Sequence, residues 1–470
     1  MFLPMESGHD HLCLQAREKM PIKHKCRYFL LFAHTVPCNK APAAESKKIR
    51  KLCVLCVSVV SCILFFCTAG PEAAEISISD FLATAKKDYL LGYQREKADY
   101  LNQASSNSPF FDRIEFRTET DEFTLSQQSY SVRAYPNGLG ATKNGQKVFQ
   151  ATLESAKSER DLLLHQALKK RYLLVSDLLS SRKLLALKKN LLALYEDRGT
   201  VLKRKIHDLD FDVNDLIRAE DDCTGAQLEL IDFENRIQTI EDEIRVYLPA
   251  AVSIEFDTHS LAGVDVIEKT MPQSKAGPVK DNVHLRNRNA RLELARSRYE
   301  LEKSENRKYI SFLEAAYDSD DRRHNSGEVF SVRLGFRLPF INSGRLDINR
   351  RKLAFLTEKR CYAEFKNMLS ENIRVFAGRL HSLLRQYEVV LANKKLGGIE
   401  SSLKSYMRLE GADPLALLEL KESILKRDIS LANIQHEIFL NHIELLDVSG
   451  KLSEPPLKNY FSASLEPITP

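Results

Sequence analysis

Acidic side chains gather at two short interruptions between stretches of helical periodicity. The first interruption and the turn after it carry Asp208, Asp210, Asp212 and Asp215, and the second carries Asp413, followed six residues later by Glu419. Closely spaced carboxylates can bind cations, and a symmetric assembly would turn each position into a ring of carboxylates. The alternative is helix capping, because Asn214 and Asp413 each precede a helical pattern and can accept hydrogen bonds from its first turn.

Other residue types with chemical potential form no recognisable site. There is no His-Glu-x-x-His pair, no phosphate-binding glycine loop and no nucleophile elbow, and the histidines are expected on solvated helix faces. Of the 9 cysteines, all but Cys223 and Cys361 lie at or before Cys67, so a disulfide framework or zinc site is not expected. We therefore expect no enzyme, no cofactor and no metal centre.

The composition is that of long amphipathic helices. Charged residues make up 28% of the chain, while there are only 18 glycines and no tryptophan. The 69 basic and 64 acidic side chains leave a formal charge of only +5. This balance indicates a solvated mixture of both signs and gives no reason to expect nucleic-acid binding.

A basic and then apolar segment near the N-terminus predicts export. A cluster of lysine and arginine at 47–51 precedes an uncharged apolar run at 52–66 and small residues at 68–70. The run of about 15 residues is short of the roughly 20 that span a bilayer, and the arrangement is typical of a signal peptide. We expect a signal peptide at 47–74 after an unstructured or mis-assigned start at 1–46. The alternatives are a retained anchor and, because Cys62 follows Val59-Val60-Ser61, a lipid on Cys62.

The exported part predicts long helices and short strand pairs. Helical periodicity covers 76–105, 146–206, 214–248, 283–308, 344–409 with an interruption at Gly397-Gly398, and 414–448. Within 344–409, the apolar residues from Leu369 to Val390 have the spacing of a coiled coil. Alternating residues at 114–118, 130–136, 309–313 and 330–339 predict four strands. Residues 249–282 predict a linker with one short strand at 252–256, and no element is expected in the tail at 449–470.

This order of elements occurs twice. The first repeat covers 75–248, with strands at about 112–136 and a helical hairpin at 146–248; the second covers 283–448, with strands at about 308–340 and a hairpin at 344–448. Each hairpin pairs a leg of about 60 residues with a return of only about 35, so the return leg needs an extension. We expect helix 283–308 to extend 214–248, and helix 76–105 to extend 414–448.

The strand pattern is compatible with a membrane barrel shared between chains. The strand at 330–338 alternates between apolar residues and Arg, Ser or Gly, and has about the length of a tilted membrane strand. A half-buried strand in a soluble sheet is the alternative. Because four strands cannot close a barrel, we expect a homotrimer with a 12-stranded barrel in contact with lipid. Its lumen would be lined by Arg117, Arg133, Arg333 and Arg337.

The chain resembles the TolC-like outer-membrane efflux proteins over residues 76–450. The resemblance rests on the order of elements, on the sequence VRLGFRLPF at 332–340 with Ser343-Gly344, and on GADPLALLE at 411–419. It implies a mostly α fold with a small β part, in which the trimer forms a shared barrel in the outer membrane and a periplasmic tunnel of α-helical coiled coils. It also implies a periplasmic adaptor and an inner-membrane transporter as partners, for multidrug efflux or type I secretion.

The resemblance places both helix breaks at a periplasmic tip that gates the tunnel. The family often has paired aspartates at the second break, where this chain has Ala416 and Glu419. The rival interpretation is a periplasmic coiled-coil adaptor or scaffold with no channel. Such a protein would carry one hairpin between compact β modules, whereas this sequence predicts two hairpins and isolated strand pairs.

Overall fold

The structure is a computed structural model, which describes residues 74–104, 109–120, 128–207, 211–249, 252–256, 263–271, 281–318, 330–337, 344–395, 397–409 and 413–468. All of them belong to one compact unit, Ala73–Pro470. Cys62 and all of the predicted signal peptide except Ala74 lie outside the described residues.

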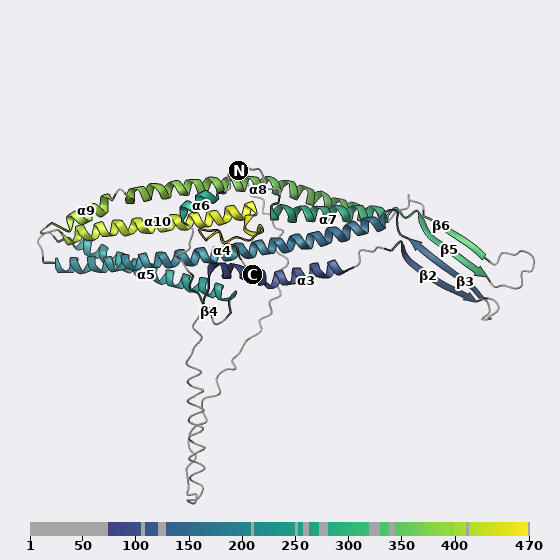
Figure 1. Cartoon of the computed structure of the whole chain (residues 1–470), viewed down its shortest axis with the longest axis horizontal. Helices are drawn as coiled ribbons and strands as arrows, with labels where there is room; N and C mark the ends of the chain where they lie inside the picture. Colours follow the sequence, from purple (N-terminus) through teal and green to yellow (C-terminus); the bar gives the residue numbers. More distant parts are fainter. Residues whose placement is uncertain are drawn as a thin grey trace, which may run out of the picture. The chain divides into compact units, whose positions relative to one another are not determined.

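Long helices packed side by side make up most of the described chain (Figure 1). Helix α4 (Ala141–Arg204) has 64 residues and is followed by α5 (Val213–Arg245). Helices α8 (Arg345–Lys395) and α9 (Gly398–Tyr406) precede α10 (Pro414–Ser449). The interruption predicted at Gly397 is confirmed, because this residue has a φ of 63°. No helix in the described parts of the chain combines the length and apolar character needed to cross a bilayer.

The segment expected as one helix at 76–105 is instead broken, so that prediction was wrong. It forms α2 (Ile78–Ala83), the 3₁₀ turn η1 (Thr84–Lys87) and α3 (Tyr89–Gln103), with extended backbone at Asp88. The break brings the Asp88 carboxylate to the guanidinium of Arg171 on α4, whose side chain is 1% exposed. Thr84 Oγ1 also accepts a hydrogen bond from Arg171 Nε at 2.8 Å. A buried charge requires such partners, which explains the interruption.

The four predicted strands are confirmed and form one antiparallel sheet. They are β2 (Phe111–Thr120), β3 (Gln128–Pro136), β5 (Ile310–Asp318) and β6 (Phe330–Phe336), in the order β2-β3-β5-β6. Two further strands, β1 (Ala74–Glu75) and β4 (Val252–Ser253), pair in parallel. The small strand predicted at 252–256 therefore exists, and its partner lies at the start of the described chain.

Two segments expected to lack structure contribute buried side chains. Helix α6 (Val264–Thr270) lies within the predicted linker and buries Ile267. After the 3₁₀ turn η2 (Lys451–Ser453), the C-terminal tail buries Phe461 and Ile468 in the same cluster as Tyr172 of α4. The hydroxyl of Tyr172 donates a hydrogen bond to the Lys458 carbonyl at 2.7 Å. The tail is thus a layer of the core around the middle of α4.

The predicted apolar seam of the second long helix faces a core. Leu369 and Leu380 of α8 are buried, and Ile373, Phe376, Leu383 and Tyr387 pack against the same cluster. Ile438 and Leu445 of α10 complete it. The sequence spacing therefore identified the face of α8 that packs against α10.

The helix extensions are exchanged relative to the expectation. Helix α7 (Val283–Glu305) follows the end of α10, where Asn282 Nδ2 donates to the Val448 carbonyl at 2.8 Å. Helix α2 lies beside the end of α5, where the rings of Phe81 and Tyr247 are 6.4 Å apart. At up to roughly 3.3 Å per residue, the chain between α5 and α7 is long enough to cross to the other leg.

Gly138, just before α4, offers a test of the packing between sheet and helices. A Cβ at Gly138 would lie 2.0 Å from the Ser304 carbonyl oxygen and 3.1 Å from Glu305 Cα, which are backbone atoms of α7. Such overpacking costs about 1–3 kcal/mol, so Gly138→Ala should lower the Tm of the purified protein by a few degrees.

Gly92 of α3 is the matched control, because a Cβ there would meet no heavy atom within 4 Å. Gly92→Ala should leave the Tm unchanged or raise it slightly, since alanine favours a helix by up to about 1 kcal/mol. Equal Tm values for the two variants would contradict the close approach at Gly138.

Candidate functional site

One face of the four-stranded sheet carries a row of alternating charges. The register aligns Glu115 with Arg133, Arg133 with Glu314, and Glu314 with Arg333, so the row crosses all four strands. Arg133 Nη2 lies 2.6 Å from Glu314 Oε2, and Arg333 Nη1 lies 4.0 Å from Glu314 Oε1. Glu314 is only 5% exposed, so its two arginine partners balance a buried charge.

Four arginines were expected to line a lumen. Three of them lie on the face of the sheet that carries the charged row. Arg117 Nη2 contacts Glu115 Oε2 at 2.7 Å, beside the row, and Arg133 and Arg333 belong to the row itself. Arg337 follows β6, and its backbone N–H donates to the Tyr309 carbonyl at 2.8 Å. The sequence interpretation missed Glu115 and Glu314, although their alternation with neighbouring strand residues was a usable signal.

The opposite face of the sheet is apolar and exposed. It carries large side chains that are all at least 38% exposed: Ile114, Phe116, Tyr130, Val132, Tyr317, Phe330, Val332 and Leu334. In the described parts of the chain, none of the four strands packs extensively against a helix. A contiguous apolar surface of this kind is unusual for a protein face in contact with water.

The two outer strands of the sheet each have one partner among the described residues. β2 pairs with β3 and β6 pairs with β5, which leaves one edge of β2 and one edge of β6. Unsatisfied edges of this kind are templates for pairing with a further strand. The edge of β2 could therefore pair with β6 of another copy of the chain, and the edge of β6 with β2 of another copy.

At the second helix break, Asp413 connects two hairpins. It caps α10 by accepting a hydrogen bond from the Leu415 amide at 3.4 Å, and it binds Lys205, just beyond α4, at 2.9 Å. Its own N–H donates to the Tyr406 hydroxyl at 3.2 Å. The hydrogen bond from Lys205 is the main cause that lowers the pKa of Asp413 below its ordinary value.

The other predicted tip residues do not gather around Asp413. Asp212, not Asn214, caps α5, by accepting from the Asn214 amide at 2.9 Å. Asp215 lies 3.8 Å from Arg218, and Glu419 is exposed on α10. Asp208 and Asp210 lie outside the described residues. Within the described part of one chain, no three of these carboxylates approach closely enough to share a cation.

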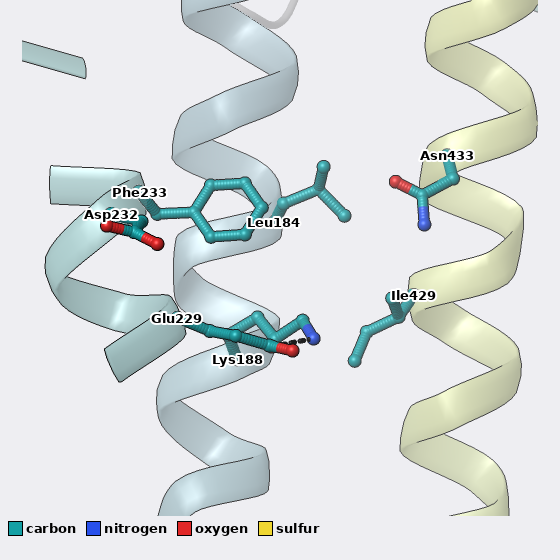
Figure 2. Close-up of a pocket in the computed structure, with 7 residues that line it drawn as sticks. All are labelled: Leu184, Lys188, Glu229, Asp232, Phe233, Ile429 and Asn433. Carbon is teal, nitrogen blue, oxygen red and sulfur yellow. Dashed lines mark hydrogen bonds and ion pairs between the residues drawn. The ribbon is translucent and has the colours of Figure 1, made fainter. Parts of the chain in front are cut away.

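An open pocket of about 330 Å³ lies between α4, α5 and α10 (Figure 2). Its lining residues are Leu184, Lys188, Glu229, Asp232, Phe233, Ile429 and Asn433. Lys188 and Glu229 form an ion pair with each other. Since the one cation of the lining is already paired, we assign no ligand to this pocket.

Two histidines expected on solvated faces are buried in the described part of the chain, so that expectation was wrong for them. His165 is fully buried, and His442 is 3% exposed. Burial is the main cause that lowers the pKa of His442 to about 4, so this imidazole is neutral at physiological pH. His165 also meets His284 and Asp447, which no sequence spacing indicated.

Neither a protein-family model nor a curated protein matches the sequence. Solved structures do match the fold. The outer membrane protein VceC of Vibrio cholerae is 14% identical, with a TM-score of 0.56 over 79% of this chain and 96% of VceC. The Campylobacter jejuni CmeC outer membrane channel is 11% identical, with a TM-score of 0.53 over 83% of this chain and 86% of CmeC.

A third match is the open state of the Neisseria gonorrhoeae MtrE outer membrane channel. It is 11% identical, with a TM-score of 0.56 over 79% of this chain and 88% of MtrE. The chain has the fold of TolC-type outer-membrane channels. This agrees with the resemblance inferred from its sequence, at identities so low that they establish the fold alone.

Two substitutions of Asp413 distinguish its role as the cap of α10 from its ion pair with Lys205. Asp413→Asn keeps a side chain that can cap α10 but removes the charge beside Lys205, whereas Asp413→Ala removes both contacts. Loss of a cap costs about 1 kcal/mol. We therefore expect hydrogen exchange in the first turn of α10 to rise about fivefold in Asp413→Ala, and less in Asp413→Asn. Equal exchange rates in both variants would show that the cap contributes nothing.

The same measurement has a defined pH dependence. Because the folded pKa of Asp413 is lowered, its charge stabilises the fold above the unfolded pKa of about 3.9. That contribution is lost as the pH falls through the lowered folded pKa. Protection of the first turn of α10 should therefore decrease with acid in the wild type, and Asp413→Asn should lack this component.

Proposed function

We propose that three copies of this chain form an exit duct in the outer membrane, with a large periplasmic part, through which an export system releases its substrates. The observation that carries the proposal is the four-stranded sheet, with one exposed apolar face, one charged face and two edges open to further pairing. Lipid requires an apolar exterior, and a membrane sheet has to close because unpaired edges are not tolerated in hydrocarbon.

Three copies of the four-stranded sheet would close a barrel of 12 strands. Because neighbouring strands alternate in direction across β2-β3-β5-β6, β6 of one copy would meet β2 of the next in the antiparallel sense. The apolar face would contact lipid and the charged row would face the lumen, with Arg117, Arg133, Arg333 and Arg337 lining it. At about 3.4 Å per residue, the 10 residues of β2 would cross a bilayer core at a moderate tilt.

Exposed apolar side chains on the helices favour association with further copies. On α8, Met368, Val375 and Val389 are all at least 51% exposed, and their spacing is a multiple of seven. On α3, Tyr93 and Tyr100 are also exposed and seven residues apart. Such spacing is typical of helix pairs in coiled coils. The two tandem repeats of strand pair and helical hairpin would supply the wall of a periplasmic tunnel.

The helix breaks would form the periplasmic tip and gate. The ion pair between Lys205 and Asp413 joins the first hairpin to the second, so it would hold the tip closed. Threefold symmetry would turn the acidic residues into rings: Asp208, Asp210, Asp212, Asp215, Asp413 and Glu419. A periplasmic adaptor and an inner-membrane transporter would dock here, in either multidrug efflux or type I secretion.

Arginine substitutions on the two faces of β6 test the barrel. Val332 is 70% exposed on the apolar face, while its neighbour Ser331 points to the charged face. Arginine facing lipid costs about 2–4 kcal/mol per chain near the middle of the bilayer. Val332→Arg should therefore strongly reduce the trimer recovered from outer-membrane fractions on unheated gels, and Ser331→Arg should not.

The wild-type result decides the proposal. A species of three times the protomer mass in the outer membrane is expected. A periplasmic species that needs no detergent would overturn the channel and leave an adaptor or scaffold as the function.

Removing Lys205 tests the gate. Lys205→Met breaks the contact between hairpins, so the conductance of single channels in planar bilayers should rise or open states should lengthen. Lys203→Met is the matched control, because Lys203 pairs with Glu220 of α5 within its own hairpin. Equal conductance of Lys205→Met and wild type would exclude this ion pair as a closing contact.

A further inference from the structure

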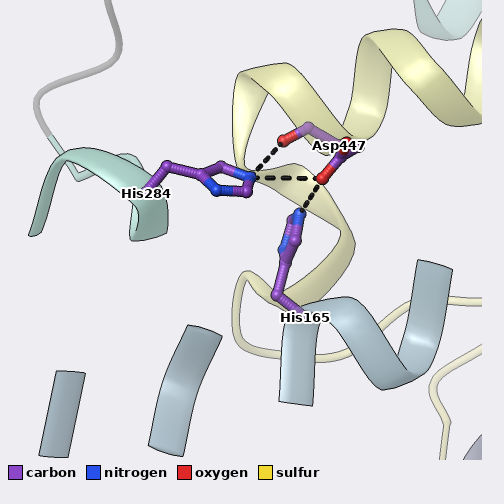
Figure 3. A group of neighbouring side chains, drawn as sticks. All are labelled: His165, His284 and Asp447. Carbon is purple, nitrogen blue, oxygen red and sulfur yellow. Dashed lines mark hydrogen bonds and ion pairs between the residues drawn. The ribbon is translucent and has the colours of Figure 1, made fainter. Parts of the chain in front are cut away.

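Three metal-binding side chains converge where α10 meets α7. His165 comes from α4, His284 from the first turn of α7, and Asp447 from the last turn of α10 (Figure 3). The Nε2 atoms of His165 and His284 lie 2.9 Å and 3.2 Å from the same oxygen, Asp447 Oδ1. All three ligand atoms lie within 4.8 Å of one another.

We propose that His165, His284 and Asp447 bind a divalent transition-metal ion of the zinc type. Two imidazole nitrogens and one carboxylate oxygen are ligands that zinc prefers, with water in a fourth position. In a tetrahedral zinc site with bonds of about 2.0–2.1 Å, ligand atoms are about 3.3 Å apart. The two distances to Asp447 Oδ1 are within a few tenths of an ångström of that value.

Completing the site requires the two imidazole nitrogens to approach one another. His165 is fully buried, whereas His284 is 19% exposed and lies in the first turn of its helix. The ring of His284 is therefore the one with room to move. The rings already lie edge to face, with centroids 4.9 Å apart.

The surroundings allow the buried ring to serve as a ligand. His165 Nδ1 lies 2.9 Å from Ser453 Oγ, a hydroxyl that can either donate or accept. Without a metal ion, His165 can present its Nε2–H to Asp447 and accept from Ser453. With a metal ion, the proton can reside on Nδ1 and bond to Ser453, which leaves Nε2 free to ligate and fixes the ring.

The local charge also suits a divalent cation. Lys169 Nζ lies 2.7 Å from Asp447 Oδ2 and 2.9 Å from Glu444 Oε2. Two carboxylates and one ammonium, with neutral imidazoles, give the group a formal charge of −1. Lys169 holds the second oxygen of Asp447 and leaves Oδ1 to the metal. The ion would join three helices at the junction between α10 and α7.

The test uses the untagged full chain, purified from membranes, stripped with chelator and titrated with Co²⁺. We expect one ion per chain, with the intense visible absorption of tetrahedral Co²⁺, and we expect Zn²⁺ to displace it and raise the Tm of the wild type. His284→Gln and Asp447→Asn should lose this absorption. His381→Gln, at an exposed position of α8, should keep it.

Either of two results would overturn the site: a stripped wild type that binds no Co²⁺ in tetrahedral geometry, or undiminished binding by His284→Gln. X-ray absorption of the Zn²⁺-loaded wild type needs no variant and guards against misfolding. Two imidazole ligands support the proposal, and ligation by sulfur or by oxygen alone contradicts it. The readouts are independent of whether the chain forms a channel.

Discussion

The length of α4 is the constraint on which the rest of the fold depends. At about 1.5 Å per residue, its 64 residues form a helix of nearly 100 Å. No other helix among the described residues is as long, so several shorter helices have to cover it, one after another along its length. Helices α3, α5, α7 and α10 all pack along it. Each place where one covering helix ends and another begins exposes helix termini and polar side chains that need partners.

Buried polar groups lie at these junctions for that reason. Beside the end of α5, Arg171 binds Asp88 and so accounts for the break between η1 and α3. Between α10 and α7, Asn282 binds the Val448 carbonyl, and Asp447 collects His165, His284 and Lys169. Burial alone would raise the pKa of Asp447, but the hydrogen bonds from these three side chains lower it well below its ordinary value. The C-terminal tail then covers the middle of α4.

The sheet meets a different requirement, because its two faces are built for different surroundings. The charged side chains of the row pair with one another across the four strands. Within the described chain, the apolar face stays exposed, and one edge of β2 and one edge of β6 pair with no further strand. An isolated copy would leave both unsatisfied. This is the physical reason why we propose a membrane barrel shared between three chains and not a soluble sheet.

The sequence by itself determined the long helices and the four strands of the sheet, because helix and strand periodicity are local properties. The alternation around Val332, the seam from Leu369 and the glycine at 397 placed strands, packing faces and a helix break correctly. It also indicated the capping role of Asp413. Only the tertiary structure decided which short helix extends which long leg, because the segment between α5 and α7 is long enough to reach either. The tertiary structure also decided which residues form the charged row, and it alone brought His165, His284 and Asp447 together. Their members are separated by up to 282 residues, and their meeting depends on strand register and helix stacking, which no local pattern encodes.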